Sequence, residues 1–337
     1  MTESDDYMLA LQEADPQAAT AAMHAALRRG ATPEQWIRNV VVPAQQTVGD
    51  RWFDGTWSIA DEHAATAVAE QAVTLLRPPD EAAPVTLDVV FACAEGEWHT
   101  FPARLAAELS GTAGVRAVFL GASVPPQHLA RRLAASAPDV LALSCTMATN
   151  LIGAWRSINA AHDLGIPVAV GGRAWGTDNL RAHALGADVR LEDPAALATT
   201  RFNGVAEPVQ LPAEAFLLEA PSPELLELVL ERQTAATPWL QGISDYQRHK
   251  GLTSLATLAS HTAAAVAARD ARILAELVDW MIGRHTQGGA PLDVLIDSCH
   301  YLADAIEPEA PLAADLLRTE GDAARRRHGD VTDLASR

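Results

Sequence analysis

The sequence predicts an α/β chain with additional helical units: an N-terminal helical bundle, a flavodoxin-like parallel sheet and a C-terminal all-helical domain. Helix start signals recur through residues 1–77, and short apolar runs alternate with helix-length segments over residues 85–200. Residues 215–337 carry helical patterns and no strand candidate. With 337 residues, of which 49% are hydrophobic and 20% charged, the chain is long enough for two or three domains with cores of their own.

The first domain, residues 1–77, is predicted to be a four-helix cap bundle. Capping residues, or proline at the first helical position, mark three of its helix starts: Asp15 with Pro16, Thr32 with Pro33, and Ser58 with Asp61. Pro43 is expected to bend its helix, and the last helix is expected to reach about Arg77. The stretch "RPPDEAAP" (77–84) is expected to be a linker, because paired prolines cannot continue a helix.

The second domain, residues 85–200, is predicted to be a doubly wound parallel sheet of five strands. Five apolar runs predict the strands: "VTLDVVFA" (85–92), "VRAVFLG" (115–121), "DVLALS" (139–144), "PVAVGG" (167–172) and "ADVRLE" (187–192). Right-handed crossovers place the loops after these strands at one edge of the sheet. Ligands bind at this carboxyl edge in such sheets, so polar residues in these loops are candidates for a site.

The remainder of the chain is predicted to be a connector, residues 201–221, followed by a helical domain. Four segments have helical patterns: 222–233, a long alanine-rich stretch 252–284, 291–307 and 311–328. Glycine and proline predict breaks at 288–291 and 308–311.

Charge and cysteine content exclude several classes of protein. A net charge of −18 argues against direct binding to nucleic acid, which needs a basic surface, and no helix-turn-helix signature occurs. Three cysteines without paired spacing predict neither a disulfide framework nor a zinc site. The acidic N-terminus and the lack of a long apolar run predict neither export nor membrane insertion. We therefore expect a cytoplasmic protein that binds neither nucleic acid nor membrane.

Three polar or glycine-rich signals converge on the predicted sheet edge. His99 follows the first strand, Ser144 and Thr146 follow the third, and Gly171-Gly172 follows the fourth. A single loop histidine is most often a solvated surface residue, so His99 alone predicts little. The three signals together, each after its own strand, predict a ligand site.

This region resembles the cobalamin-binding domain family of methionine synthase, corrinoid methyl carriers and B12-dependent photoreceptors. The family pattern is acidic-x-His-x-x-Gly, then Ser-x-Thr, then Gly-Gly. Its pieces here are Glu97-Trp98-His99, Ser144-Cys145-Thr146 and Gly171-Gly172. Glu97 stands where Asp is more usual, and Pro102 stands where the family has Gly. The alternative is a flavodoxin-like domain of another kind, in which the paired glycines only make a tight turn.

The resemblance implies a role for each of these residues. His99 would be the lower axial ligand of cobalt, since imidazole is a good neutral ligand, while the dimethylbenzimidazole tail of the corrinoid swings away. Glu97 would accept the other ring N–H of His99 and fix its tautomer. Ser144 would extend that relay or meet the tail, and Thr146 would line the same slot. Gly171-Gly172 would leave room for the nucleotide tail against the backbone.

The cap carries a second motif. "WFDGTWSIADEH" places Trp52 nine residues before Glu62-His63 and resembles the Trp-x9-Glu-His motif of adenosylcobalamin photoreceptors of the CarH type. The resemblance implies that Trp52 covers the adenosyl group while Glu62 and His63 contact it. The family often has a histidine directly after the tryptophan, where this chain has Phe53. Alternatively, Trp52 is a core or interface aromatic, like its neighbour Trp57, and Glu62-His63 an exposed helix start.

The resemblance implies a cobalt-containing photoreceptor for light sensing and signalling, with adenosylcobalamin as cofactor, and not an enzyme. By domain order the chain also resembles the photocobilins, which pair B12 with biliverdin. A light-dependent homo-oligomer or a partner protein would then carry the output. The alternatives are a corrinoid methyl carrier of a methyltransferase system and a B12-binding scaffold whose helical tail mediates association.

The helical domain offers candidate contacts for biliverdin near the corrin. They are the residues whose side chains pair with propionates or pack on a tetrapyrrole: His249, His261, His285, His300, Arg269, Arg272 and Arg284. The alternative is that these residues form a solvated helix face. Cys299 lies in an apolar helical stretch, which favours a core cysteine over a covalent attachment point.

Overall fold

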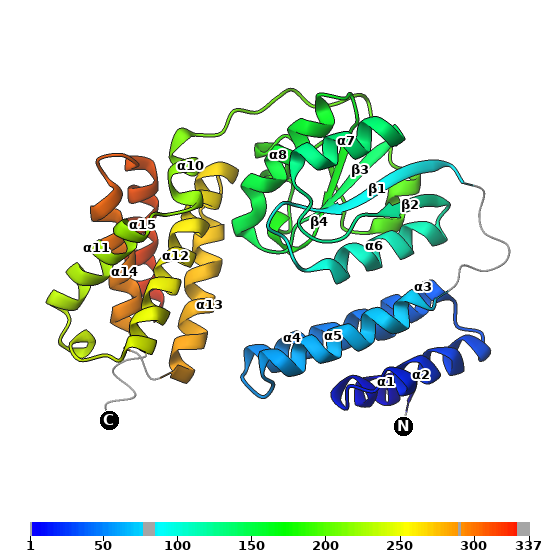
Figure 1. Cartoon of the computed structure of the whole chain (residues 1–337), viewed down its shortest axis with the longest axis horizontal. Coiled ribbons are helices and arrows are strands. Elements are labelled where there is room, and N and C mark those ends of the chain that lie inside the picture. The colour runs from blue at the N-terminus through cyan, green and yellow to red at the C-terminus, as the bar shows by residue number, and fades with distance from the viewer. Residues whose placement is uncertain (1, 77–84, 289–290, 329–337) are drawn as a thin grey trace.

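The computed structural model describes residues 2–76, 85–288 and 291–328 and has three parts. Figure 1 shows a helical cap (blue), an α/β domain (cyan to green) above it, and a group of C-terminal helices (yellow to red) beside both. The linker predicted at 77–84 lies outside the described residues. Among the described helices, none has the length and apolar character needed to cross a membrane.

The cap is built from the predicted helices. Its elements are α1 (Glu3–Gln12), α2 (Pro16–Arg28), α3 (Pro33–Trp36), a π-helical segment (Ile37–Val41), α4 (Val42–Phe53) and α5 (Ile59–Thr74). The predicted caps at Asp15, Thr32 and Ser58 are confirmed by side chains that accept hydrogen bonds from the first-turn amides. Pro43 follows directly on the π-helical segment, which changes the helix geometry where a proline removes an amide donor.

The α/β domain contains the five predicted parallel strands. They are β1 (Leu87–Cys93), β2 (Val115–Phe119), β3 (Val140–Ser144), β4 (Val168–Gly171) and β5 (Val189–Arg190), in the order β2-β1-β3-β4-β5. Their main crossover helices are α6 (Thr100–Thr112), α7 (Pro126–Ser136), α8 (Leu151–His162) and α9 (Leu180–Ala184). The order reverses between β1 and β3, so the carboxyl ends of these two strands flank the crevice where such sheets bind ligands.

The two faces of the sheet are buried in different cores. Val89 and Phe91 of β1 pack with α6 and with the 3-10 helix Pro194–Thr199, whereas Val90 and Ala92 face the core formed by α7 and α8. This alternation is the period of two expected for a strand that is covered on both sides.

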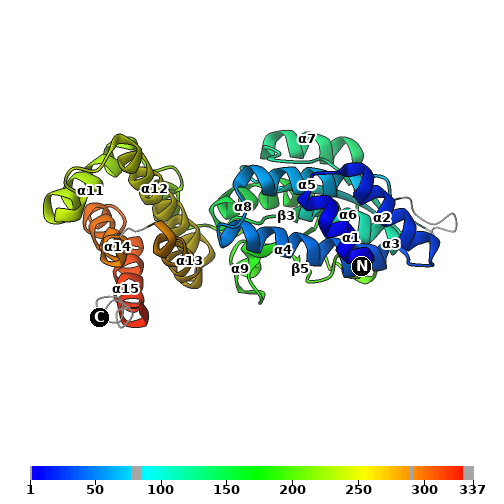
Figure 2. The ribbon, with the colours of Figure 1, turned by 90° about the horizontal axis from the view of Figure 1, so that it is seen from below.

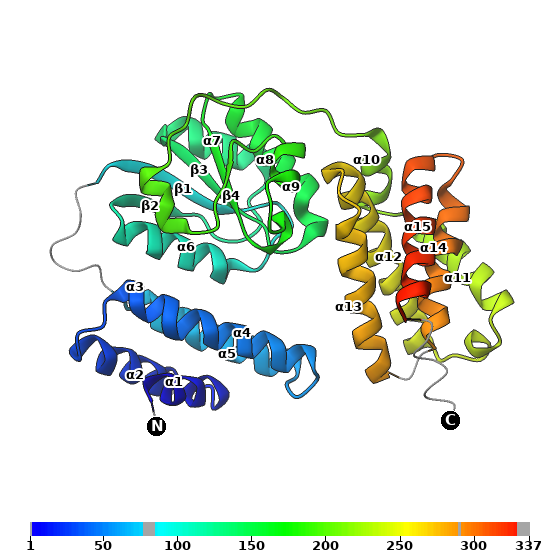
Figure 3. The same cartoon turned by 180° about the vertical axis from the view of Figure 1, so that it is seen from behind.

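The C-terminal part differs from the prediction at two points. Its helices are α10 (Ala213–Glu219), α11 (Pro223–Ala236), α12 (Asp245–Ala268), α13 (Arg272–Gly288), α14 (Leu292–Ile306) and α15 (Pro311–His328). The connector prediction missed α10, and the helical stretch predicted over 252–284 is divided between α12 and α13, because α12 is capped by Arg269 in a left-handed conformation (φ 51°). Figure 3 shows the irregular connector 201–212 passing along the α/β domain before α10 begins.

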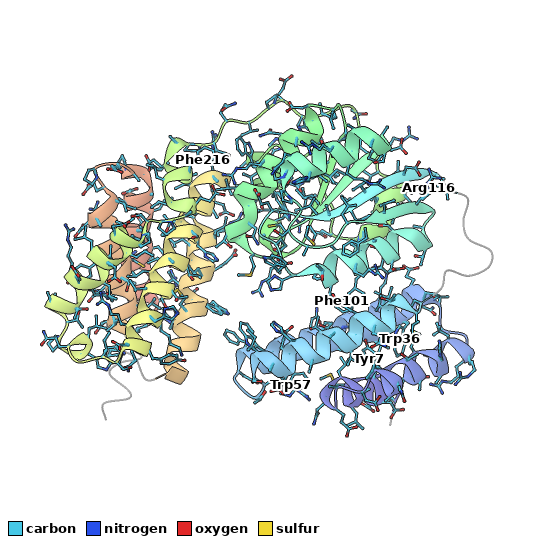
Figure 4. The ribbon with its side chains drawn as sticks, in the orientation of Figure 1. Tyr7, Trp36, Trp57, Phe101, Arg116 and Phe216 are labelled. Carbon is cyan, nitrogen blue, oxygen red and sulfur yellow. The ribbon has the colours of Figure 1, made fainter. Side chains whose placement is uncertain are left out.

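Both helical parts pack on the α/β domain. Phe101 of α6 lies at the boundary with the cap (Figure 4) and is buried in the cap core with Leu105 and Leu109. The buried apolar side chains of α7 and α8 are continuous with those of α12 and α13. Seen from below, α12 and α13 are the C-terminal helices that face the other two parts (Figure 2).

Candidate cofactor site

The residues that end the central strands form one row at the carboxyl edge of the sheet. In the strand register, Cys93 is paired with Ser144, and Ser144 with Gly171. The loop that carries Glu97 and His99 follows Cys93 directly, and Thr146 follows Ser144 by two residues. The structure therefore brings the three sequence signals of the α/β domain together at the edge where the strand order reverses.

The centre of this edge is a fully buried carboxylate. Glu97 has no exposed surface, and its Oε1 lies 2.6 Å from Nδ1 of His99. Its Oε2 accepts hydrogen bonds from the backbone amides of Thr146 at 2.7 Å and Met147 at 2.9 Å, and from Nδ2 of Asn150 at 3.2 Å. A buried charge needs such partners to be stable, and here they come from both loops of the crevice.

These contacts determine the charge state of the pair. Burial alone raises the pKa of Glu97, but hydrogen bonds from the His99 side chain and from the amides of Met147, His99 and Thr146 outweigh burial and lower this pKa to about 2. The hydrogen bond to Glu97 is the main reason why the pKa of His99 is raised. The carboxylate is therefore ionised at neutral pH and fixes which ring nitrogen of His99 carries a proton.

The orientation of His99 leaves one ring nitrogen for a ligand. Because Nδ1 is directed at Glu97, a neutral imidazole carries its proton there and its lone pair on Nε2. His99 is the residue before α6, and its side chain is about half exposed (55%). Pro102, which replaces the family's glycine, lies in the first turn of α6, where its missing amide removes no helical hydrogen bond. The loop thus accepts the proline without losing the Glu97–His99 contact.

The two glycines of the Gly171-Gly172 pair differ in whether the backbone requires a glycine at that position. Gly172 has φ 106° and ψ 164°, which other residues hardly adopt, and a Cβ there would collide with the backbone of Cys145. A Cβ on Gly171 would meet only the carbonyl oxygen of Leu191, at an ordinary 3.7 Å. The backbone conformation of the turn therefore requires glycine at 172, as expected if the glycines only make a tight turn. Gly171 is not required by the backbone, and the space beside it is open.

Thr146 and Ser144, the two polar residues predicted to line the site, have different hydrogen-bonding environments. The hydroxyl of Thr146 is buried without a hydrogen-bond partner among the described residues, which is the state expected of a group that awaits a ligand. Ser144 is buried, and among the described residues its side chain makes no hydrogen bond to Glu97, whose second oxygen is bound by Thr146, Met147 and Asn150 instead; contact of Ser144 with the nucleotide tail stays a prediction. Asn150 was missed, because no local spacing links it to a carboxylate 53 residues away.

The cap motif lies at the turn between α4 and α5. Glu62 accepts a hydrogen bond from the hydroxyl of Thr66 and lies 3.4 Å from Nε2 of His63. The charge of Glu62 also contributes to the raised pKa of His99. The hydroxyl of Thr100, at the start of α6, donates to Glu70 of α5 at 2.9 Å and so ties α5 to the α/β domain. His63 is largely exposed (72%), so this side of the site is much more open than the Glu97 side.

The two tryptophans of the motif have different environments. Trp57 packs against the cap core, with the guanidinium of Arg51 at 5.0 Å from its ring, as a structural aromatic does. Trp52 instead stacks on Trp280 of α13, with ring centroids 6.3 Å apart and an interplanar angle of 27°. The sequence alone did not associate Trp280 with the cap.

The donor set fits a corrinoid better than a bare metal ion. Within the described residues, no group of three or more histidine, cysteine or acidic side chains is arranged to hold a metal. Cys93 and Cys145 are buried, and burial is the main cause that raises the pKa of both thiols, so they are protonated. Cobalt in a corrin ring needs only one protein ligand, which Nε2 of His99 would provide, and the same sheet edge holds the space at Gly171 and the unpartnered hydroxyl of Thr146.

Comparison with known proteins agrees with this geometry. Residues 87–201 match a protein-family model described as B12 binding domain, and residues 4–77 match a second model with the same description. The HTH-type transcriptional repressor CarH of Myxococcus xanthus is 33% identical over 148 residues, which cover 42% of this chain and 48% of that protein. Trimethylamine corrinoid protein 2 of Methanosarcina acetivorans is 27% identical over 146 residues, which cover 42% of this chain and 67% of that protein.

Among solved structures, the monomethylamine corrinoid protein of Methanosarcina barkeri aligns with 57% of this chain and 93% of its own, with a TM-score of 0.49 and 19% identity. The chain spans about half the length of the CarH repressor. The two matched regions coincide with the cap and the α/β domain, whose facing surfaces hold the residues described above. The chain therefore contains a two-part B12-binding module and is a cobalamin-binding protein similar to CarH over that module.

Proposed function

We propose that the protein is an adenosylcobalamin-dependent light sensor and not an enzyme. The observation that carries this proposal is the cap motif: Trp52 lies at the end of α4 and Glu62-His63 in the first turns of α5, on the two sides of the cap turn, and the charge of Glu62 acts on His99. A broad aromatic ring beside two polar side chains suits a nucleoside, whose base stacks and whose sugar has hydroxyl groups. The 33% identity to the CarH repressor over the module supports the same assignment.

Each residue has a defined task in this proposal. His99 would hold cobalt through Nε2, and Glu97 keeps Nδ1 protonated and the ring in place. Thr146 and the space at Gly171 receive the nucleotide tail. Adenosylcobalamin supplies a cobalt–carbon bond that light cleaves.

The response to light arises from the cap. Trp52 would cover the adenosyl group and Glu62 and His63 would bind its sugar, so the cap contacts of these three residues would depend on whether this group is present. The equilibrium between cap positions then shifts by the free energy of those contacts. Output passes through a light-dependent homo-oligomer or a partner protein and not through direct DNA binding, in keeping with the net charge of −18.

Domain order supports biliverdin as a second chromophore in the C-terminal helices. Two of the residues predicted to contact biliverdin already bind other protein groups: Nδ1 of His261 faces the carbonyl of Thr257, and Arg272 forms ion pairs with Asp178 and Asp270. His300 lies beside Asp322 in an open hollow of about 440 Å³ that is largely acidic and therefore suits propionates poorly. Cys299 is buried, as expected for a core cysteine. Full-length protein mixed with biliverdin tests this part, and an unshifted red absorption band excludes the second chromophore.

A methyl carrier is the second candidate, favoured by the 27% identity to the trimethylamine corrinoid protein. Titration in darkness with adenosyl- and methylcobalamin separates the two functions. The sensor binds the adenosyl form more tightly, and Trp52→Ala reduces that preference by about two- to tenfold, since one aromatic stack is lost. Trp57→Ala is the matched control, because Trp57 packs in the cap core. Equal affinities of the parent protein for both forms favour the methyl carrier.

A further inference from the structure

The helix α13 contacts the cap at Trp52 and Phe53, the end of α4 that contributes to the proposed adenosyl pocket. The ring of Trp280 stacks on Trp52, and it also lies 6.5 Å from the ring of Phe53. Gly283, one turn further along α13, is close to Phe53: a Cβ at this position would be 3.3 Å from the end of that ring. Trp280 of the C-terminal helices thus packs against Trp52, the residue that the resemblance implies covers the adenosyl group.

Other side chains of α13 fix the helix in the C-terminal core. Leu277, Val278, Met281 and Ile282 are buried in this core, whereas 37% of Trp280 is exposed. Trp280 is therefore not needed to fill this core. Its position on the outer face is explained by the contact with the cap.

The first turn of α13 is attached to the other side of the site. Arg181 is almost fully buried (1% exposed) and donates to Asp270, just before α13, and to Glu276 within it. The same guanidinium donates to the carbonyl of Ala174, in the turn that follows Gly171-Gly172. Arg272 links Asp270 to Asp178. Since buried ion pairs with several hydrogen bonds are costly to break, this end of α13 is held firmly against the glycine turn.

One helix therefore connects the two sides of the candidate site. Arg272 and Trp280 are eight residues apart, which corresponds to about 12 Å along a helix axis. The Arg272 end is fixed near the turn proposed to receive the nucleotide tail, and the Trp280 end meets the cap tryptophan. A movement of Trp52 relative to the sheet edge must either move α13 or break the aromatic stack.

We propose that Trp280 is a positioning residue that holds Trp52 over the upper face of the cofactor, and that the Trp52–Trp280 stack couples the cap to the C-terminal helices. This inference rests on the proposed function for the identity of the upper ligand. The contact itself does not depend on it. Coupling is reciprocal: if the adenosyl group favours the stacked position of Trp52, then the stack favours binding of the adenosyl form by the same factor.

The test uses the full-length protein and the variants Trp280→Ala and Trp280→Phe. Affinities for adenosyl- and methylcobalamin are measured in darkness by absorption. Trp280→Ala lowers affinity for the adenosyl form by about two- to tenfold, the range for one aromatic pair, and leaves the methyl form within about twofold. Trp280→Phe restores most of the loss, because phenylalanine can still stack. Trp239→Ala is the matched control, since Trp239 is an exposed tryptophan (42%) of the same helical part, away from the cap.

A second readout needs no cofactor. Hydrogen exchange of residues 48–57 in cofactor-free protein becomes faster in Trp280→Ala and returns toward the parent rate in Trp280→Phe, because the stack restrains the end of α4. Parent-like exchange and parent-like affinities in Trp280→Ala overturn the inference and leave the proposed function standing. If the parent does not prefer the adenosyl form, the proposed function fails, and the exchange rates alone decide whether Trp280 positions Trp52.

Discussion

The two sides of the cofactor site are built in different ways. On the sheet side, Glu97 is fully buried and has partners on both oxygens, which come from two loops. On the cap side, Glu62 is 28% exposed and His63 is 72% exposed, and Trp52 relies on a ring from a distant helix. The sheet side is already in place without a cofactor, whereas the cap side has polar groups that remain available to one.

This difference indicates a division of labour. A preorganised lower side costs little to complete when cobalt binds, because the orientation of His99 has been fixed during folding. On the upper side, the exposed side chains of Glu62 and His63 can change position at low cost, since few buried contacts restrain them. We therefore expect substitutions on the sheet side to affect binding of every cobalamin, and substitutions on the cap side to affect the choice among them.

The largest effect is expected from removal of the lower ligand. His99→Ala should weaken binding of adenosyl- and methylcobalamin alike, by about 100-fold or more, since loss of a direct ligand exceeds the 10–100-fold cost of losing an outer partner. The absorption spectrum of bound cobalamin should change as well. A variant with the spectrum and affinities of the parent would remove His99 from the cobalt site.

Glu97→Gln tests the preorganisation of the lower side. Glutamine keeps the shape of the side chain but lacks the charge that holds His99, so cobalamin affinity should fall by about 10–100-fold. Glu95→Gln is the matched control, because Glu95 lies in the same loop, is 39% exposed and forms a long ion pair with Arg156, at 3.9 Å. Equal losses in the two variants would show a general effect of charge and not the fixing of His99.

The paired glycines separate folding from binding on the sheet side. Gly172→Ala should destabilise the cofactor-free protein by about 1–3 kcal/mol, because alanine is strained at φ 106° and collides with the backbone of Cys145. Gly171→Ala should leave the unfolding temperature nearly unchanged, since the added Cβ meets no close neighbour in the cofactor-free protein. It should weaken cobalamin binding, because the Cβ fills space proposed for the nucleotide tail. Thermal unfolding and cobalamin titration of both variants check this, and a destabilised Gly171→Ala would be at odds with it.

The smallest effect concerns the attachment of α13, and it depends on pH. Burial raises the pKa of Asp270, but hydrogen bonds from Arg272 and Arg181 outweigh burial and lower it below the ordinary value. A depressed carboxyl pKa stabilises the fold above about pH 4, and this stabilisation is lost as the pH falls through the lowered pKa. Because Arg181 keeps Glu276 and the carbonyl of Ala174 as partners, Asp270→Asn should cost only about 1 kcal/mol at pH 7 and progressively less below pH 4. A difference from the parent that is the same at pH 7 and pH 3 would exclude this titration.

Local signals explain why much of the fold was predictable. The caps at Thr32 and Ser58 need only residues three positions away, and the strands are short apolar runs between helical patterns. The Glu97–His99 pair was accessible for the same reason, because its members are two residues apart.

The features that were missed depend on distant partners. The break at Arg269 has neither glycine nor proline, and the residue that follows it, Asp270, is held by Arg181, 89 residues earlier. Asn150 reaches Glu97 from another loop, and Trp280 meets Trp52 only once α13 is placed beside the cap. Such contacts are set by tertiary packing, which periodicity and spacing do not encode.

The most direct test of the light-sensor proposal is a comparison of the dark and illuminated protein loaded with adenosylcobalamin. Because free adenosylcobalamin is itself cleaved by light, the decisive signal is the state of the protein: its elution volume on gel filtration and the hydrogen exchange of residues 48–57. The account predicts that green light changes the cobalamin spectrum together with both protein signals, while illuminated cofactor-free protein stays unchanged. A spectral change with an unaltered elution volume and unaltered exchange would contradict it.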